Sequence, residues 1–248
     1  FLVFVNLESS PVSLVEQLGD LPQRCANYRL EEWGVAREKV YHIKANYKLI
    51  GENFMEYYHL PWVHPELVKV SRMEHHYRWQ GPGMYNGMVT TPIAQNTDEG
   101  GWMGLPPLPT LDSSERDTAR FIWLFPNVAI NILPNHCFIM ITDPIAPDYT
   151  VETTRILLPP ESDSSPEKER TLDQLGHFWD LVNVQDVEIV ERVQDGLSTS
   201  PYEGGRMCFK FEEPLHRFQN MIIDRLVGIY RIPPGDEQQQ VPMFPTAN

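Results

Sequence analysis

Hydrophobic and polar residues alternate through the middle of the chain, roughly from residue 75 to residue 158. The runs are short and rich in Val, Ile, Thr and aromatic residues, and Pro, Asn, Asp or Gly separate them, which is the pattern of β-strands joined by turns. Their close spacing predicts an antiparallel meander. The predicted strands cover residues 75–80, 83–92, 120–125, 128–133, 136–143 and 149–158.

Helical patterns lie on both sides of this region. Residues 49–59 predict a helix that Pro61 ends, because proline lacks the N–H that a helix interior requires. A longer helix is predicted from Pro166, with a serine cap at residues 164–165, to about Gln194, and Gly196 fits its C-terminal cap. Shorter patterns predict helices at 12–18 and 211–229 and strands at 1–7 and 39–48.

A run of strands followed by long helices predicts an α+β fold, with an antiparallel sheet and helices against one face. A curved sheet wrapped around a long helix leaves space for an apolar pocket between the two layers. Residues 97–114, rich in Gly and Pro, are predicted to form a mobile loop that serves as a lid or channel wall, and residues 233–248 an extended tail. The chain starts without Met inside a predicted strand, which suggests a piece of a longer protein.

Composition narrows the possible functions. The formal net charge of −14 and the absence of a basic block argue against nucleic acid as a partner, and no apolar run is long enough for a membrane span. Three widely spaced cysteines, Cys25, Cys137 and Cys208, suggest neither a disulfide framework nor an iron–sulfur site with four cysteines. We therefore expect a reducing compartment, the cytoplasm or, in a photosynthetic eukaryote, the plastid stroma.

Two histidines in a short segment are the first candidate metal ligands. His59 follows Glu56 by three residues, and His64 follows His59 by five, beyond Pro61. Two neutral imidazoles and one carboxylate form the 2-His-1-carboxylate face that suits non-haem Fe(II) and leaves positions open for O₂. Since the chain has eight histidines, the pair alone is also compatible with a core histidine and a loop histidine.

The third ligand is expected on the long late helix, which carries several acids. Asp186 lies four residues from both Val182 and Val190 and so falls in the apolar stripe, whereas Asp180 and Glu188 fit the polar side better. An acid in such a stripe is costly unless it is paired or binds a metal, which singles out Asp186. Glu56 is predicted to share a helix face with His59 and to orient an imidazole, with an ordinary surface glutamate as the alternative.

Two segments resemble the catalytic domain of Rieske-type non-haem iron oxygenases. The first runs from Asn46 to Glu66 and contains Glu-Asn-Phe-Met-Glu-Tyr-Tyr-His followed by His-Pro-Glu. The second is Gln-Asp-Val-Glu-Ile-Val-Glu-Arg-Val-Gln-Asp-Gly-Leu at 185–197, followed by Tyr202 and Gly205-Arg206. Phe-Pro-Asn at 125–127 and Phe-Val-Asn-Leu at 4–7 are similar to further segments of that family. Together these motifs extend the resemblance over essentially the whole chain.

The resemblance implies a set of site residues and partners. His59, His64 and Asp186 would bind mononuclear Fe(II), Glu56 would bridge to a Rieske [2Fe–2S] cluster across a subunit boundary in a homotrimer, and Asn53 is a further candidate catalytic residue. A ferredoxin or flavin reductase would supply electrons. The implied fold is the helix-grip (Bet v 1-like) sheet around a long C-terminal helix, with the iron domain at 1–232 and the tail at 233–248.

This sequence departs from the family pattern in two ways. Tyr47 stands where the family usually has tryptophan, which is a conservative change. The Rieske module, with its two cysteines and two histidines, is absent from this chain. We therefore expect that the cluster belongs to a missing segment or to another polypeptide.

The first segment most resembles the branch that acts on quaternary ammonium compounds, such as choline monooxygenase and betaine demethylases. A quaternary ammonium substrate needs an aromatic cage, for which Trp123, Phe125, Phe138 and Trp179 are candidates, with ordinary core packing as the alternative. Three other functions remain open at this point: a ring-hydroxylating oxygenase acting on an aromatic substrate, a binder of apolar ligands without chemistry, and a zinc hydrolase using the same three side chains.

Overall fold

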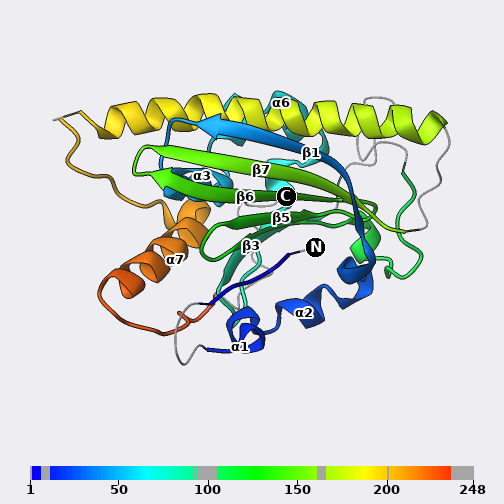
Figure 1. Cartoon of the computed structure of the whole chain (residues 1–248), viewed down its shortest axis with the longest axis horizontal. Coiled ribbons are helices and arrows are strands. Elements are labelled where there is room, and N and C mark those ends of the chain that lie inside the picture. The colour runs from blue at the N-terminus through cyan, green and yellow to red at the C-terminus, as the bar shows by residue number, and fades with distance from the viewer. Residues whose placement is uncertain are drawn as a thin grey trace.

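A single antiparallel sheet of seven strands organises the part of the chain that the computed structural model describes, namely residues 2–6, 12–91, 93, 105–160, 166–199 and 201–235 (Figure 1). The order is β1-β7-β6-β5-β4-β3-β2, so the meander is continuous from β2 to β7 and β1 closes onto β7. The strands are β1 (Gly34–Ile43), β2 (His76–Arg78), β3 (Tyr85–Thr90), β4 (Ala119–Leu124), β5 (Val128–Ile132), β6 (Cys137–Ala146) and β7 (Tyr149–Leu158). The six strands predicted in the middle of the chain are therefore confirmed.

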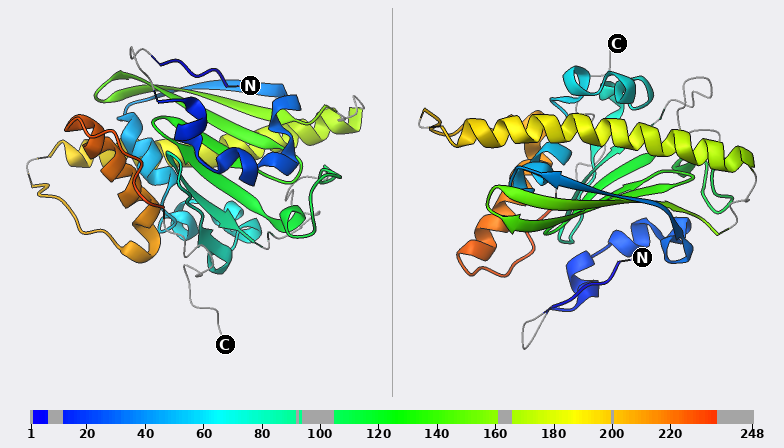
Figure 2. Two further views of the ribbon diagram at one scale, coloured as in Figure 1. Left: turned by 90° about the horizontal axis from the view of Figure 1, so that it is seen from below. Right: turned by 45° about the horizontal axis from the view of Figure 1, so that its top comes forward.

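The long helix lies against one face of this sheet, as predicted, and two short N-terminal helices lie against the other face, as Figure 2 shows. The long helix α6 (Pro166–Leu197) crosses one face, together with α3 (Tyr47–Phe54), α4 (Leu60–Val63) and α5 (Pro65–Val70), and α7 (Phe209–Leu226) contacts β3. The short N-terminal helices α1 (Leu14–Leu18) and α2 (Leu21–Arg24) lie at the opposite face. Single 3₁₀ turns cover Ala26–Tyr28, Leu30–Glu32, Met73–His75 and Glu115–Asp117. None of the described helices combines the length and the hydropathy needed to cross a bilayer.

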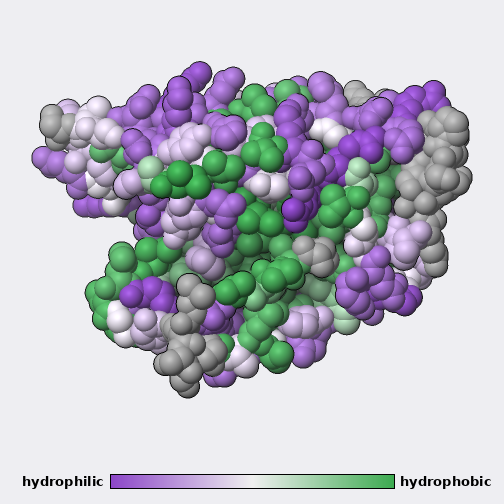
Figure 3. Space-filling view, viewed as in Figure 1, coloured by the Kyte–Doolittle hydropathy of each residue, from purple (hydrophilic) through white to green (hydrophobic). Residues whose placement is uncertain are grey.

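Alternation along each strand divides the core into two clusters. The inner face, which we define as the face beneath α6, carries Phe121, Phe138 and Met140, and these pack with Leu175 and Trp179 of the helix. The outer face carries mainly aliphatic side chains, which pack with Leu21, Tyr28 and Trp33 of the N-terminal segment; the outer-face residues of the three central strands are Ile122, Leu124, Val128, Ile130, Ile132, Cys137 and Ile139. In Figure 3, hydrophilic side chains predominate along α6, while hydrophobic ones gather over the strands below it.

One glycine allows α3 to approach the sheet closely. A Cβ added at Gly51 would lie 2.8 Å from the Trp123 ring, closer than real Cβ contacts allow. Asn46 caps this helix, since its Oδ1 accepts from the Lys48 N–H at 3.1 Å. The segment that follows α3 is thus held directly above the inner face.

A buried arginine links three further segments. Arg217 of α7 donates to the carbonyl oxygens of Gly81 (3.1 Å), Gly83 (3.0 Å) and Pro233 (2.7 Å). It thereby ties the β2–β3 connection and the segment after α7 to that helix.

The structure corrects several predicted boundaries. Residues 2–6 form no strand and are largely exposed, although residues 1–7 were predicted to form a buried one. The strand predicted at 39–48 is β1, which begins at Gly34, and residue 47 already belongs to α3. Gly196 lies inside α6 rather than capping it, because the helix continues to Leu197.

Two predicted loop regions are described only in part. In the predicted lid, residues 97–104 lie outside the described residues, as do residues 236–248 of the tail and the serines predicted to cap α6. The described part of the lid packs against the sheet: Leu111 is buried, and the Leu108 N–H donates to the Pro134 carbonyl at 2.9 Å.

Candidate metal centre

His59 and His64 lie on the irregular connection between helices on the inner face. The predicted helix 49–59 ends at Phe54, and Pro61 does not end a helix but occupies the first turn of α4, where its missing N–H costs nothing. His59 precedes α4 and His64 follows it, so this one-turn helix turns both imidazoles toward α6. The short helix α4 is thus the element that brings His64 back toward His59.

Asp186 comes from the middle of α6. It follows the buried residues Leu175, Trp179 and Val182 at spacings of three or four and precedes the buried Val190. This is the apolar stripe predicted from the sequence, and it directs Asp186 toward the inner face. Asp180 and Glu188 lie off this stripe: Asp180 accepts from Tyr41 at 2.6 Å, and Glu188 is exposed.

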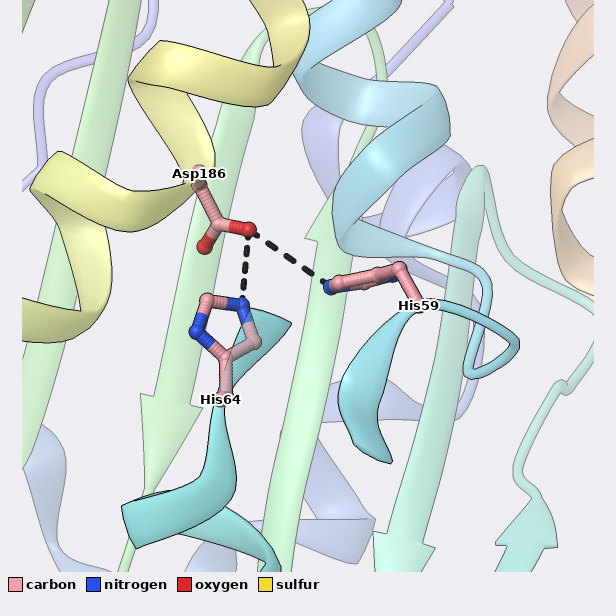
Figure 4. Close-up of side chains that lie close together, drawn as sticks. All are labelled: His59, His64 and Asp186. Atoms are coloured by element: carbon pink, nitrogen blue, oxygen red, sulfur yellow. Dashed lines mark hydrogen bonds and ion pairs between the residues drawn. The ribbon is translucent and has the colours of Figure 1, made fainter. Parts of the chain in front are cut away.

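The three side chains converge, as Figure 4 shows. Asp186 Oδ1 lies 2.8 Å from His64 Nε2 and 3.5 Å from His59 Nε2, and one ligand atom of each residue lies within 4.8 Å of the others. The two imidazole rings are nearly perpendicular, at 78° with centroids 5.1 Å apart.

This donor set fits a divalent transition-metal ion. With metal–ligand bonds of about 2.1 Å, neighbouring ligands of an octahedral ion lie about 3 Å apart, close to the two separations from Asp186 Oδ1. Two nitrogens and one oxygen on one side are the facial set that suits Fe(II), and tetrahedral Zn(II) accepts the same three atoms.

Hydrogen bonds orient each of the three side chains. Glu56 Oε1 contacts His59 Nδ1, and Gln185 Oε1 lies 2.9 Å from His64 Nδ1, so both imidazoles are held with Nε2 toward Asp186. Asn53 Nδ2 donates to Asp186 Oδ1 at 2.7 Å. Glu56 and His59 do not share a helix face as predicted; Glu56 Oε2 instead accepts from the backbone N–H groups of Tyr58 and His59 in a turn.

The charges of the cluster shift two pKa values. Burial lowers the pKa of His59, but hydrogen bonds and charge from Asp186 and Glu56 outweigh burial and raise it to about 9. Burial raises the pKa of Asp186, but its hydrogen bonds to His59 and His64 dominate and hold it well below its ordinary value. The carboxylate is thus kept ionised, as a metal ligand must be.

A cavity opens beside the three side chains, between α6 and the sheet. The volume of this cavity is about 60 Å³, which is enough for several waters or part of a small organic molecule. Its wall is mainly apolar and aromatic, with a few polar groups; besides the metal-site residues it includes Phe54, Tyr57, Leu67, Ser71, His76, Met88, Phe121, Asn131, Phe138, Met140, Trp179 and Asn183.

Two of the four predicted cage aromatics line this cavity. Phe138 and Trp179 stack in parallel, with centroids 4.6 Å apart. Trp123 and Phe125 are not among its lining residues: Trp123 fills the space beneath Gly51, and both rings contact Phe218 of α7. The structure therefore brings together one aromatic pair rather than four rings.

Sequence reasoning assigned no role to three residues of this site. Gln185 directly precedes Asp186 in the segment 185–197 that resembles the oxygenase family. This position next to a predicted ligand was the signal in the sequence that could have identified it. Tyr57 and Asn131, unlike Gln185, line the cavity. An asparagine at the centre of an otherwise apolar strand was the only sequence signal for Asn131.

Comparisons with known proteins agree with this architecture. The family model described as the ring hydroxylating alpha subunit (catalytic domain) matches residues 30–228. The chain is 25% identical over 257 residues to the glycine betaine monooxygenase oxygenase subunit of Chromohalobacter salexigens and 23% identical to that of Pseudomonas aeruginosa. The alignments cover 91% of this chain but only 57% and 59% of those proteins, so the chain spans less than two thirds of their length.

Solved structures show the same fold. A quaternary ammonium Rieske monooxygenase superposes with a TM-score of 0.71 at 19% identity, over 88% of this chain and 57% of that one. Naphthalene 1,2-dioxygenase from Rhodococcus sp. superposes with a TM-score of 0.62 at 16% identity, over 82% of this chain and 54% of that one. The predicted α+β helix-grip architecture is thus confirmed, and the family match over most of the chain shows that it belongs to the ring-hydroxylating oxygenase alpha subunits, as their catalytic domain.

Proposed function

We propose that this chain is the catalytic part of an oxygenase that uses O₂ to hydroxylate or oxidatively demethylate a small organic substrate. His59, His64 and Asp186 would hold the Fe(II). The observation that carries this proposal is the convergence of two imidazole nitrogens and one carboxylate oxygen beside an apolar cavity. Bound iron supplies the activation of O₂, and the protein provides the ligands, the orienting hydrogen bonds and a site sheltered from bulk water.

We propose that electrons reach the site from a Rieske [2Fe–2S] module, fed by a ferredoxin or flavin reductase. Glu56 would form the bridge, because its carboxylate contacts His59 directly. Tyr58 and Trp62 flank this point and are exposed, which leaves room for a donor. A homotrimer would place the cluster of one subunit beside Glu56 of the next.

The relatives support a substrate class without fixing the substrate. A quaternary ammonium compound is the first candidate, since the names of both the sequence relatives and one solved structure specify such compounds. The aromatic pair Phe138 and Trp179 supports it, because aromatic faces attract quaternary ammonium groups. An aromatic substrate is the second candidate, favoured by the similarity to naphthalene 1,2-dioxygenase and by the aromatic cavity wall.

Metal binding under anaerobic conditions tests the proposal. The chain is expected to bind one Fe(II), and His59→Ala to lose stoichiometric binding because one of three ligands is removed. His42→Ala, which changes an exposed histidine of β1, is the matched control and should bind like the wild type. Retained stoichiometric iron in His59→Ala would reject the ligand assignment. A strong preference for zinc would indicate a hydrolase, and no metal at all a simple binder.

The bridging role of Glu56 is tested separately, with the Rieske module and reductase present. Glu56→Gln is expected to keep iron, because the amide oxygen can still accept from His59, but to lose turnover. Undiminished turnover would remove Glu56 from the electron path.

A further inference from the structure

Two buried polar atoms in the cavity wall have no hydrogen-bond partner within the part of the chain that the structure describes. They are the hydroxyl oxygen of Tyr57 and the side-chain oxygen of Asn131, and each residue is only 3% exposed. Leaving such a group unpaired costs about 1–3 kcal/mol, so buried polar groups in proteins are nearly always satisfied. Two of them on one cavity wall point to a ligand that completes their hydrogen bonds.

Asn131 occupies a position that the fold does not require to be polar. It lies in the central strand β5, on the inner face, paired across the sheet with Phe121 on β4 and Phe138 on β6. Every residue of β5 is buried, and the others are Val, Ala and Ile. An amide between two phenylalanines weakens this part of the core unless something in the cavity binds it.

The neighbouring polar groups of the wall are already satisfied and uncharged. Ser71 Oγ lies 3.1 Å from His76 Nε2 and 2.8 Å from Thr90 Oγ1, and His76 Nδ1 donates to the Arg72 carbonyl at 2.7 Å. Burial lowers the pKa of His76 to about 4, so this imidazole is neutral. The Tyr57 ring lies against it, with centroids 4.2 Å apart.

The wall also has no lysine or arginine among the described residues that line the cavity. The imidazoles of His59 and His64 already contact carboxylates and are not left to pair with an anionic substrate. The two carboxylates of the wall, Glu56 and Asp186, contact His59 and His64, and they would balance the charge of a bound divalent ion. A substrate carboxylate would therefore be buried without an opposite charge, which is costly.

We infer that Tyr57 and Asn131 form the substrate-recognition pair of this site and that they bind an uncharged hydrogen-bonding group, a hydroxyl or an amide. The Tyr57 hydroxyl can donate, and the Asn131 amide can accept and donate, so together they match such a group. The rest of the substrate would lie against Phe121, Phe138 and Met140. This inference rests on the proposed function, and it separates the chain from its glycine betaine relatives, whose named substrate carries a carboxylate.

Stability measurements distinguish a recognition role from a structural one. In the metal-free, ligand-free chain, Asn131→Leu is expected to leave the Tm unchanged or raise it by about 2–4 °C, because an unpaired buried amide is replaced by an apolar group of similar size. Tyr57→Phe should likewise cause no loss. A clear fall in Tm for both variants would show that the two polar groups support the fold, and it would overturn the inference.

Binding of three matched probes tests the chemistry. Benzamide, benzoate and toluene share a ring but differ in the attached group, and calorimetry on the chain measures their affinities. Benzamide is expected to bind about ten-fold more tightly than either of the others. Tyr57→Phe and Asn131→Leu should each remove most of that preference, whereas Tyr149→Phe, which changes a half-buried tyrosine of β7 outside the cavity, should retain it. Preference for benzoate, or no preference in the wild type, would overturn the inference.

The two proposals fail in different ways. If wild-type chain binds no Fe(II), the proposed function fails whatever the probes do. If Fe(II) binds stoichiometrically to the wild type and to both variants but the probes are not distinguished, only the recognition pair is rejected.

Discussion

The two faces of the sheet share the same strands but are built differently. On the outer face, Ile122, Ile130 and Ile139 form a closed aliphatic layer against the N-terminal segment. On the inner face, one residue away along each strand, stand Phe121, Asn131 and Phe138, beside a cavity. Alternate positions along each strand therefore serve different purposes: one set stabilises the sheet and the other shapes a site.

The inner face carries polar groups next to the proposed site. Asn131 and Glu152 bring polar side chains from the sheet toward α6, and Asp186 projects from that helix. Groups of this kind lower stability unless they are paired, and proteins retain them mainly where function needs them. Substitutions on the two faces should therefore separate binding from stability.

The largest effect is expected at Asp186. Asp186→Ala removes the only carboxylate of the proposed ligand set, and we expect metal affinity to fall by at least about 1,000-fold, more than the 10–100-fold typical of a lost orienting group. Anaerobic Fe(II) titration measures the loss. Glu188→Ala, an exposed acid on the same helix, is the control. Equal affinity in the two variants would contradict the assignment of α6 to the site.

Substitutions on the outer face should lower stability and leave metal affinity unchanged. Ile139→Ala is expected to lower the free energy of unfolding by about 3 kcal/mol, because it opens a cavity in a closed layer. Ile139→Val should cost about 1 kcal/mol. Denaturant unfolding measures both, and metal affinity at sub-denaturing conditions should match the wild type. A large loss of metal affinity in Ile139→Val would mean that the two faces are not independent.

A buried carboxyl on β7 should make stability depend on pH. Burial raises the pKa of Glu152 to about 7; Asn183, which donates to it at 2.7 Å, only partly opposes this. Because the folded pKa lies above the ordinary value of 4.5, its contribution is fully present below pH 4.5 and is lost as the pH rises through 7.

Glu152→Gln removes this titration while an amide oxygen can still accept from Asn183. At pH 8 we expect the metal-free variant to be more stable than the wild type, by about 3 kcal/mol at most. At pH 4 the two should be equal. Unfolding curves at both pH values measure the difference, and an equal gain at pH 4 would show that charge is not its cause.

The smallest effect is expected at Gln185, which contacts a proposed ligand but no ion. Gln185→Ala leaves the His64 Nδ1–H without its partner, and we expect metal affinity to fall 10–100-fold. Gln185→Glu, which can accept the same hydrogen bond, should restore affinity. Failure of the glutamate variant to do so would indicate that Gln185 acts through packing.

The sequence predicted the middle strands and Asp186 for the same physical reason. In a half-buried strand every second residue is apolar, and in a half-buried helix the apolar residues form a stripe along one face. An acidic residue inside such a stripe can therefore be recognised from the sequence. The contact between Glu56 and His59 was also predicted, but for the wrong reason, because the helix ends at Phe54 and a turn makes the contact.

Other features depend on distant contacts that one sequence does not display. A role for Asn131 in the site can be inferred only from the strand register, which places it between two phenylalanines in the cavity wall. Trp123 was a reasonable cage candidate, yet the close approach of α3 at Gly51 determines that it fills the core instead. The domain boundary at residue 232 stays a prediction.

The three proposed ligands come from two distant parts of the chain. Two come from a short irregular stretch and the third from the middle of a 32-residue helix far along the chain. An ion held between them would act as a reversible cross-link, and by mass action it would stabilise only the native state. Heat denaturation would then report the fraction of loaded molecules, without any need for substrate, electron donor or oxygen.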